Sequence, residues 1–372
     1  MNLPLRSVLT MLFSRRFTVG VYEGVLRGEA GNGSLHYVGK GDSLAWLQHL
    51  LFETEPKTCQ TRQTSLLALR VGGLPPAASG LHVVEVTPFL DRLLRPQGHI
   101  VIPDWIEHLL DLDGDWAAVC GRFRKSTLKR DVPRIQRAGF RYDIVQDAAS
   151  LEIFYENQYA PLMADRHGEA GVLVSRDWLR TTTPTHRLFR LWDDGHWVAS
   201  ALFREVGEEL DWILVGMNRQ QPSPNQRLVQ GALYYHMIQH AHASGFRRIR
   251  LGTTRPLLTD GVWLHKRKWG ACVVASPQSE TRLYLSANRP DGTMVSWLTR
   301  QPWVSVSADT LEVQVCALSS ALIPDVLDVL KQGVLDGISR IRVFSPFSDS
   351  GLPECIDGIP LEQSIFTFGE RS

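Results

Sequence analysis

The chain has 372 residues, of which 44% are hydrophobic and 21% are charged, and its formal net charge is +1. These values are ordinary for globular proteins, so they exclude wholesale disorder and a fibrous repeat, and the net charge alone predicts no anionic partner. The length predicts two or three compact units, because one domain usually takes about 100–200 residues.

The cysteines indicate a reducing compartment. Their number is odd and no CxxC pair occurs, so neither a disulfide framework nor a zinc site is expected. We therefore expect a cytoplasmic protein. The five are Cys59, Cys120, Cys272, Cys316 and Cys355.

The first 17 residues are apolar with interspersed basic residues. Their longest apolar stretch is far shorter than the roughly 20 residues that a transmembrane helix needs, so no transmembrane segment is expected. Two interpretations stay open for residues 1–17. They form either an amphipathic helix in peripheral contact with the inner membrane or a segment that docks on the protein's own core.

The first part of the chain alternates strand-like and helix-like stretches, and the first unit is expected to end near residue 120. Glycine- and serine-rich runs at Gly31–Ser34 and Gly72–Gly80 are typical of loops. The predicted elements are strands at Phe17–Tyr22, Ser65–Val71 and Leu81–Val86, and helices at Ser43–Phe52 and Asp104–Leu112.

The next predicted element is a helix that begins with Ser150 as its N-cap and ends at Pro161, with apolar residues at helical spacing between them. Three strand-like runs follow a polar linker. The pair Asp194-Gly195 separates the first two runs and is typical of a tight hairpin turn, so we expect an antiparallel meander. The three runs are Arg187–Trp192, Trp197–Glu205 and Glu209–Met217.

A strong helix start follows the meander. Ser223 can cap the helix, Pro224 can take its first position, and Gln226 can complete a capping box. Gly245 offers a left-handed stop, after which Arg247–Leu251 reads as a strand. A helical crossover makes this strand parallel to the third strand of the meander, and we expect a cleft between the two.

The remainder reads as further α/β structure, either a small extra unit or a segment that completes the fold. The sequence therefore divides into residues 1–120, 121–280 and 281–372. The C-terminal elements are strands at Arg282–Leu285, Thr310–Val315 and Arg340–Phe344 and a helix at Pro324–Val334.

Meander, helix and strand in this order resemble the core of the GNAT acyltransferases, and three local blocks resemble the branch related to Fem-type peptidoglycan aminoacyltransferases. The resemblance implies a mixed sheet flanked by helices in residues 121–280, and a degenerate second GNAT-like half in residues 1–120. The blocks are Thr127–Phe140, Phe154–Pro161 with Arg166-His167-Gly168, and Gly245–Gly252 with Asp260–Gly270.

The identity of the donor stays open. Acyl-CoA-dependent GNAT enzymes resemble one another in a glycine-containing loop whose amides hold the pyrophosphate, and the corresponding stretch Asn218–Arg227 has no glycine. We therefore expect weak or no binding of coenzyme A through this loop. Fem-type enzymes commonly carry a helical arm for an aminoacyl-tRNA donor, and no long charged heptad segment occurs here. Acyl-CoA and aminoacyl-tRNA both remain candidate donors, and no cofactor is assigned.

A basic run at residues 122–141 contains eight bases and one acid. Such a field suits phosphate groups, because arginine forks match phosphate oxygens, and the alternative is an ordinary solvated helix face. The residues predicted to contact the donor's phosphates are Lys125, Lys129, Arg130 and Arg134.

The Asp165–Gly168 loop is expected to carry working residues. The resemblance implies that His167 accepts a proton from the attacking amine, since histidine titrates near neutral pH. Arg166 is expected to hold an anionic group, and Asp165 and Tyr159 to contact substrate. The alternative for His167 is a solvent-exposed structural histidine.

The turn before Gly270 is the second predicted catalytic segment. The resemblance places Lys266 near the reacting groups, where its ammonium would stabilise a developing oxyanion, with Lys268 and Trp269 contacting substrate. The alternative is a basic surface turn with Trp269 packed inward.

His236 and His240 have the i, i+4 spacing that can chelate a metal, and His242 follows. No third ligand is evident, so no metal site is predicted, and His236 is assigned to substrate contact instead.

These observations favour a GNAT-fold transferase that joins an acyl or aminoacyl group to an amine acceptor such as a peptide or an amino sugar, without a covalent enzyme intermediate. Two alternatives remain: an acyl-CoA-dependent N-acyltransferase with an atypical pyrophosphate loop, and a non-catalytic module that binds polyanions.

Overall fold

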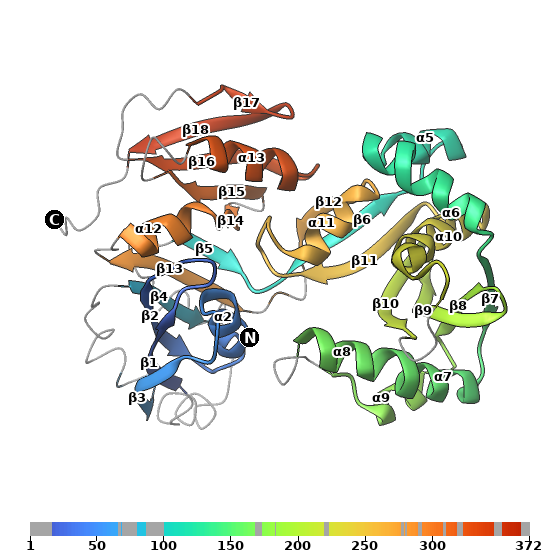
Figure 1. The fold of residues 1–372 in the computed structure, drawn as a ribbon, viewed down its shortest axis with the longest axis horizontal. Coiled ribbons are helices and arrows are strands. Elements are labelled where there is room, and N and C mark those ends of the chain that lie inside the picture. The colour runs from blue at the N-terminus through green and yellow to red at the C-terminus, as the bar shows by residue number, and fades with distance from the viewer. Residues whose placement is uncertain are drawn as a thin grey trace, which may run out of the picture. The chain divides into compact units, whose positions relative to one another are not determined.

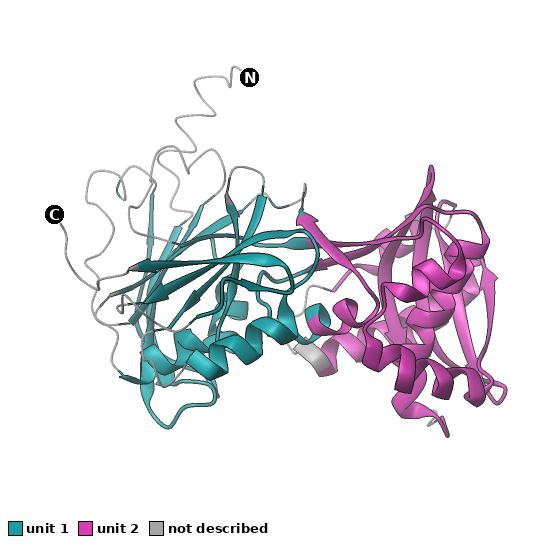
Figure 2. Cartoon of the chain, turned by 90° about the horizontal axis from the view of Figure 1, so that it is seen from above, with its two compact units in different colours: residues 1–106, 254–263, 275–372 teal, residues 107–253, 264–274 magenta. Residues whose placement is uncertain are grey.

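The computed structural model describes residues 17–65, 68, 80–86, 100–167, 173–182, 184–218, 223–276, 279, 281–288, 292–307, 310–317, 323–345 and 352–365. The chain forms two compact units, which Figure 2 shows in different colours. Unit 1 comprises Met1–Ile106, Thr254–Trp263 and Ala275–Ser372, and unit 2 comprises Glu107–Thr253 and Leu264–Val274. In the described ranges, no helix is both long and apolar enough to cross a bilayer. The three-segment division at residues 120 and 280 stays a prediction.

Unit 1 contains two sheets, and the larger has six strands in the order β3-β1-β2-β4-β13-β5 (Figure 1). Neighbours pair antiparallel except β2 and β4, which are parallel. Helices α2 (Leu44–Leu51) and α12 (Gly292–Thr299) pack their apolar residues into the core beside this sheet. The strands are β1 (Phe17–Val25), β2 (Asn32–Gly39), β3 (Lys57–Thr64), β4 (Gly80–Val86), β5 (Ile100–Pro103) and β13 (Arg282–Asn288).

The second sheet of unit 1 has the order β14-β15-β16-β18-β17. Helix α13 (Ile323–Gly333) connects the parallel strands β15 and β16, and β18 continues the parallel part. The predicted C-terminal strands and helix are confirmed. The strands are β14 (Trp303–Ser307), β15 (Thr310–Cys316), β16 (Ile338–Ser345), β17 (Cys355–Ile356) and β18 (Ile359–Ile365).

Unit 2 is built on a seven-stranded mixed sheet in the order β12-β6-β11-β10-β9-β8-β7. One apolar core gathers side chains of α5, α6 and α10, and a second gathers those of α7, α9 and the π-helical turn η2. The strands are β6 (Ile106–Asp111), β7 (Arg141–Val145), β8 (Arg187–Asp193), β9 (His196–Val206), β10 (Glu209–Met217), β11 (Arg248–Thr254) and β12 (Cys272–Ala275).

The helical segments of unit 2 follow the chain around this sheet. They are α5 (Trp116–Gly121), η1 (Thr127–Asp131), α6 (Val132–Ala138), α7 (Ala148–Phe154), η2 (Tyr155–Tyr159), α8 (Ala160–His167), α9 (Arg176–Thr182), η4 (Gln226–Leu228) and α10 (Val229–Ala243). Helix α11 (Gly261–Lys268) begins in unit 1 and ends in unit 2.

The predicted meander, helix and parallel strand are confirmed. At the hairpin between β8 and β9, Asp194 and Gly195 have φ angles of 46° and 76°, the positive values that a tight turn requires. Helix α10 ends at Gly245, whose φ is 82°, and the amides of Gly245 and Phe246 donate to the carbonyls of His242 and Ala241. This is a Schellman stop. Strand β11 then pairs parallel to β10.

The predicted helix at Asp104–Leu112 is wrong, because β6 occupies this stretch as a strand between β12 and β11. All residues from Ile106 to Leu110 are buried. Short apolar runs fit a fully buried strand as well as a helix, and periodicity alone does not separate the two. The position inside the sheet decided the outcome.

The helix predicted from Ser150 to Pro161 exists with different ends. Asp147 is the N-cap, since its carboxylate accepts the Ser150 amide at 2.8 Å. The helical path continues through Pro161 to His167, because the π-helical turn η2 directly precedes the proline and alters the local hydrogen-bond register. Of the predicted strand Ser65–Val71, only Ser65 and Ala68 are among the described residues, and residues 1–16 lie outside them.

Candidate functional site

A hollow of about 600 Å³ opens in unit 2 between α6 and the segment that begins α10. We call it the arginine hollow. Three of its lining side chains are the exposed arginines Arg134, Arg137 and Arg227. The other lining residues are Ala138, Pro224, Asn225, Gln226 and Leu228. Three like charges around one concave surface favour an anionic ligand.

The three arginines have little to neutralise them within the molecule. Arg137 Nε donates to the carbonyl oxygen of Pro133 at 3.1 Å, a neutral acceptor. Across the described part of the chain, no ion pair joins Arg134, Arg137 or Arg227 to a carboxylate, whereas Arg130 pairs with Asp131 at 3.1 Å. Among the described residues, therefore, no carboxylate cancels the positive charge of the hollow.

The segment that opens α10 is fixed by a capping box. Gln226 Oε1 accepts the Ser223 amide at 3.3 Å, and Ser223 Oγ accepts the Asn225 amide at 3.0 Å. This confirms the predicted helix start, although its first turn is the 3₁₀ segment η4. Of the stretch Asn218–Arg227 that the sequence marked as lacking glycine, residues 219–222 lie outside the described part.

A buried aspartate clamps this same segment. Asp193, at the end of β8, is 3% exposed, and its carboxylate accepts hydrogen bonds from the Ser223 hydroxyl and from the Asn225 side-chain amide at 3.1 Å. The Asn225 backbone amide adds a longer contact at 3.4 Å. An ionised acceptor strengthens such bonds. Asp193 therefore positions the backbone that forms one wall of the arginine hollow.

The predicted phosphate-binding residues lie on one continuous helical segment, η1 with α6 and the residues before it. Arg134 lines the hollow, and Lys125 and Lys129 are exposed on the preceding turns. Arg130 and Lys268 lie 3.1 Å and 3.8 Å from the Asp131 carboxylate, which partly neutralises both. Lys125 and Lys129 are not among the residues that line the hollow, and their predicted phosphate contacts stay predictions.

Lys266 lies in the interior of unit 2, where it is 3% exposed. Its Nζ donates to the carbonyl oxygens of Gly252 at 2.9 Å and Thr253 at 3.2 Å, at the end of β11. Burial and the positive charge of Lys266 hold the pKa of His108 well below its ordinary value. The alternative of a basic surface turn does not describe this buried ammonium, and the catalytic role of Lys266 stays a prediction.

Strands β10 and β11 pair over only three residues, Glu209–Asp211 opposite Arg248–Arg250. Both strands are described beyond this point, to Met217 and Thr254, and they make no further ladder pairs with each other there. A bulge interrupts the β9–β10 register at the same level. The two strands therefore part next to the Lys266 contacts, although the cleft predicted between them stays a prediction.

Trp269 and its neighbours form an aromatic cluster at the end of α11. Trp269 is fully buried, and its indole N–H donates to His265 Nε2 at 3.3 Å. The ring of Tyr234 from α10 lies 4.6 Å from that of His265 and 4.6 Å from that of Trp212. Trp269 thus packs inward, and its predicted contact with substrate stays untested.

Of the residues predicted on η2 and α8, Tyr159 and Asp165 are not among those that line the arginine hollow. Tyr159 is buried, burial raises the pKa of its phenol, and its hydroxyl accepts the Val174 amide at 3.1 Å. Asp165 is exposed near the end of α8. Arg166 and His167 have described backbone, and their side chains lie outside the described part. The predicted roles of these four residues remain predictions.

His236 is half-buried on α10, where burial lowers its pKa, and its ring lies 5.2 Å from that of Tyr235 and 5.9 Å from that of Tyr142. The His240 ring also lies 5.9 Å from that of Tyr142, and burial lowers the pKa of His240 as well. Within the described residues, no group of three histidine, cysteine, aspartate or glutamate side chains could hold a metal ion.

The sequence analysis assigned no role to Arg227 or Asp193, and it placed Arg137 in the basic run at residues 122–141 without selecting it as one of the four phosphate contacts. Arg227 follows a recognisable helix start, and a base in the first turn after Ser223-Pro224 is a signal that could have been read. Asp193 precedes a hairpin turn, where an acid is typical of the turn itself. Its link to Asn225 is a tertiary contact that spacing does not reveal.

Comparison with known proteins gives structural neighbours only. No family model and no curated protein matches the chain. Among solved structures, FemX matches with 12% identity and a TM-score of 0.38 over 68% of this chain and 81% of FemX. L-PGS from Bacillus licheniformis matches with 13% identity and a TM-score of 0.35 over 77% of this chain and 86% of that one. A GCN5-related N-acetyltransferase from Sphaerobacter thermophilus matches with 15% identity and a TM-score of 0.32, covering 71% and 75%.

Proposed function

We propose that unit 2 is an aminoacyltransferase that takes its aminoacyl group from an RNA-borne ester and joins it to an amine. The observation that carries the proposal is the arginine hollow, because three arginines, which no described carboxylate pairs with, line one concave surface between α6 and the segment that begins α10. Phosphate oxygens are the natural partners of such a surface.

The extent of the basic surface favours RNA over a small phosphate ester. Lys125, Lys129, Arg134 and Arg137 are all exposed, and the first and last are twelve residues apart on one helical segment, which corresponds to roughly 18 Å at the usual helical rise. A nucleic-acid strand carries a charge about every 3.4 Å of axis, so several successive phosphates fit this length. A single pyrophosphate uses only a small part of it.

The lack of glycine in the described part of Asn218–Arg227 agrees with an RNA-borne donor instead of coenzyme A. In the segment after residue 222, the backbone is held by Asp193 and by the capping box, and its side chains face the hollow. A pyrophosphate bound by backbone amides needs close approach of bare backbone, which glycine permits. Arginine side chains instead reach outward to a larger anion.

The transfer itself would use orientation and charge stabilisation. The amine nitrogen attacks the ester carbonyl carbon, the tetrahedral intermediate collapses with cleavage of the C–O bond, and the departing ribose hydroxyl retains the electron pair and gains a proton. The attacking nitrogen loses a proton, for which His167 is the proposed acceptor. The buried ammonium of Lys266, beside the parting of β10 and β11, is the proposed source of positive potential for the oxyanion.

The proposal is tested by neutralising the hollow. The triple variant Arg134→Gln/Arg137→Gln/Arg227→Gln is expected to weaken binding of tRNA at least tenfold, because charge-assisted phosphate contacts are lost. A matched control removes three exposed arginines that already pair with carboxylates, Arg176, Arg180 and Arg204. It has the same net charge and is expected to bind tRNA within about twofold of the wild type.

Titrations with tRNA and acetyl-CoA, read by fluorescence anisotropy and calorimetry, distinguish the alternatives. Equal weakening in both triple variants would point to a diffuse polyanion-binding module instead of a site. Micromolar acetyl-CoA binding that the hollow variant alone abolishes would identify a coenzyme-A-dependent acyltransferase. For turnover, release of the amino acid from aminoacyl-tRNA to hydroxylamine as surrogate acceptor should fall in the hollow variant and persist in the control.

A further inference from the structure

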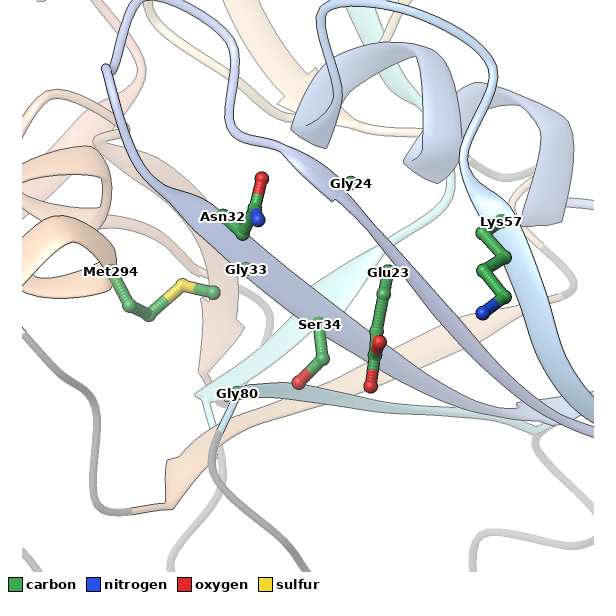
Figure 3. Close-up of a pocket in the computed structure, with 8 residues that line it drawn as sticks. All are labelled: Glu23, Gly24, Asn32, Gly33, Ser34, Lys57, Gly80 and Met294. Atoms are coloured by element: carbon green, nitrogen blue, oxygen red, sulfur yellow. The ribbon is translucent and has the colours of Figure 1, made fainter.

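Unit 1 contains a second hollow, of about 350 Å³, at one end of its six-stranded sheet (Figure 3). Its lining comes from β1, β2, β3 and β4 together with α12, which lies more than 200 residues later in the chain. The side chains that define its chemistry are those of Glu23, Asn32, Ser34, Lys57 and Met294. We call it the unit 1 hollow.

One acid and one base face this hollow as cross-strand neighbours. Glu23 on β1 and Lys57 on β3 are register partners, and both are exposed. Opposite charges at such positions ordinarily attract each other. Over the described residues, however, no ion pair joins either side chain to a partner. In Figure 3 the Lys57 ammonium extends toward the side on which the Glu23 carboxylate lies.

Neutral hydrogen-bonding groups complete the polar side. Ser34 is the register partner of Glu23 on β2, and Figure 3 shows their side chains pointing the same way. The Asn32 amide, with donors and an acceptor, lies two residues earlier on the same strand. Met294 from α12 supplies an apolar wall. The lining therefore offers one negative charge, one positive charge, neutral polar atoms and an apolar surface.

We infer that the unit 1 hollow binds a small zwitterion of the α-amino-acid class. The ligand's ammonium lies at the Glu23 carboxylate and its carboxylate at the Lys57 ammonium, while its side chain lies toward Met294. A zwitterion matches two opposite charges that the protein leaves unpaired with each other, whereas a polyanion is repelled by Glu23 and a polycation by Lys57. The volume lies at the lower end of ligand pockets, which suits a single small molecule.

The test uses the full chain and three probes, L-alanine, L-serine and L-lysine, with ligand-detected NMR and calorimetry. Ethylamine and propionate serve as the analogues of alanine that keep only one of its charged groups. Saturable binding of at least one amino acid is expected. Ethylamine and propionate are each expected to bind at least about tenfold more weakly than alanine, because each loses one charge-assisted contact.

Variants assign the binding to this hollow. Glu23→Gln and Lys57→Gln are each expected to weaken amino-acid binding about tenfold or more, and both positions are exposed, so the fold is retained. Arg62→Gln is the matched control, since it removes an exposed base from the same strand β3 outside the lining. The triple variant of the arginine hollow should bind the amino acid as the wild type does.

Cysteine labelling gives an independent readout. The Cys59 thiol lies beside Glu23, and Cys355 in the other sheet of unit 1 is also exposed. Saturating amino acid is expected to slow alkylation of Cys59 several-fold and to leave Cys355 unchanged. The inference is overturned if none of the three amino acids binds saturably, if one charged group alone binds as well as the zwitterion, or if Arg62→Gln weakens binding as much as the Glu23 and Lys57 variants.

Discussion

The two hollows place charge in opposite ways. In unit 2, three arginines of one sign surround the arginine hollow, and no described carboxylate pairs with them. In unit 1, a single acid and a single base line the unit 1 hollow as cross-strand neighbours. A concentrated charge of one sign selects extended anions through counterion release, whereas a balanced pair selects a small ligand by geometry. If both proposals hold, a few side chains at the ends of strands and helices decide which class of ligand each unit binds.

The two units also differ in the ionisable groups whose pKa is shifted by burial. In unit 2, burial lowers the pKa of His108, His236 and His240. Unit 1 buries carboxyl groups, and burial raises the pKa of Glu85 and Asp104. Acidification therefore destabilises the interior of unit 2, while alkalinisation above the ordinary carboxyl pKa destabilises that of unit 1.

Substitution of Lys266 is expected to give the largest effect. Lys266→Ala should lower turnover with aminoacyl-tRNA and hydroxylamine by roughly 100-fold or more, because a preorganised positive charge is lost. It should also lower the free energy of unfolding by about 1–3 kcal/mol, since the buried carbonyls of Gly252 and Thr253 lose a charged donor. Steady-state kinetics and urea unfolding measure the two effects.

Lys266→Met separates these contributions, because methionine fills most of the lost volume. If turnover in Lys266→Met is near that of the wild type, the lysine is structural and the proposed oxyanion role is wrong. Loss of turnover with a small loss of stability supports the role.

The salt dependence of ligand binding should differ between the two hollows. Raising monovalent salt from about 50 to about 200 mM should weaken tRNA binding at least roughly 15-fold, if three phosphates are neutralised with a slope near −0.7 per phosphate. Binding of an amino acid to unit 1 should change by less than about twofold, because a zwitterion displaces no net counterions. Equal salt dependence of the two ligands would remove the contrast.

Substitution of Asp193, which holds one wall of the arginine hollow, gives the next test. Asp193→Asn is expected to raise the KM for aminoacyl-tRNA about tenfold with a smaller change in kcat, because the loop loses charge-assisted hydrogen bonds and positions Arg227 less well. Kinetics at several donor concentrations provide the measurement. A fall in kcat at unchanged KM would place Asp193 in the chemistry instead of in donor binding.

The pH response of unit 2 should depend on His108. Its folded pKa is lowered, so the unfolded chain binds the proton first, and stability that is complete above about pH 6.5 falls as the pH decreases toward the folded pKa. The limiting slope for one proton is about 1.4 kcal/mol per pH unit. His108→Leu is expected to flatten this decline in urea unfolding between pH 6.5 and 5, whereas His49→Leu, at an exposed position, should not.

Glu85 should give the smallest effect and the opposite sign. Its carboxylate accepts hydrogen bonds from the Tyr37 hydroxyl and the Ser43 amide, which offset part of the burial that raises its pKa. Its contribution to stability is complete below about pH 4.5 and is lost as the pH rises through the folded pKa. Glu85→Gln should reduce this loss, and Glu53→Gln, which is exposed, should leave it unchanged. A steeper loss in Glu85→Gln would contradict the assignment.

Local sequence signals determined much of unit 2. Asp194-Gly195, the Ser223–Gln226 capping box and Gly245 each act through neighbouring backbone, so the meander, α10 and β11 were predictable with their order. The dense basic run at residues 122–141 could also be read from the sequence, since the charge of a side chain follows from its residue type. Of its four predicted phosphate contacts, Arg134 lines the hollow and Arg130 is paired with Asp131.

Tertiary structure decided what local signals could not. The stretch Ile106–Asp111 is a strand because its place between β12 and β11 buries it on both faces, and a helix of the same residues would leave that position in the sheet empty. Arg227 lines one hollow with Arg134 and Arg137, which lie about 90 positions earlier in the chain, and Asp193 holds Asn225 across 32 positions. Glu23 and Lys57 face one hollow only because β1 and β3 pair in one register. Local backbone preferences act over a few residues, whereas these juxtapositions depend on how whole elements pack.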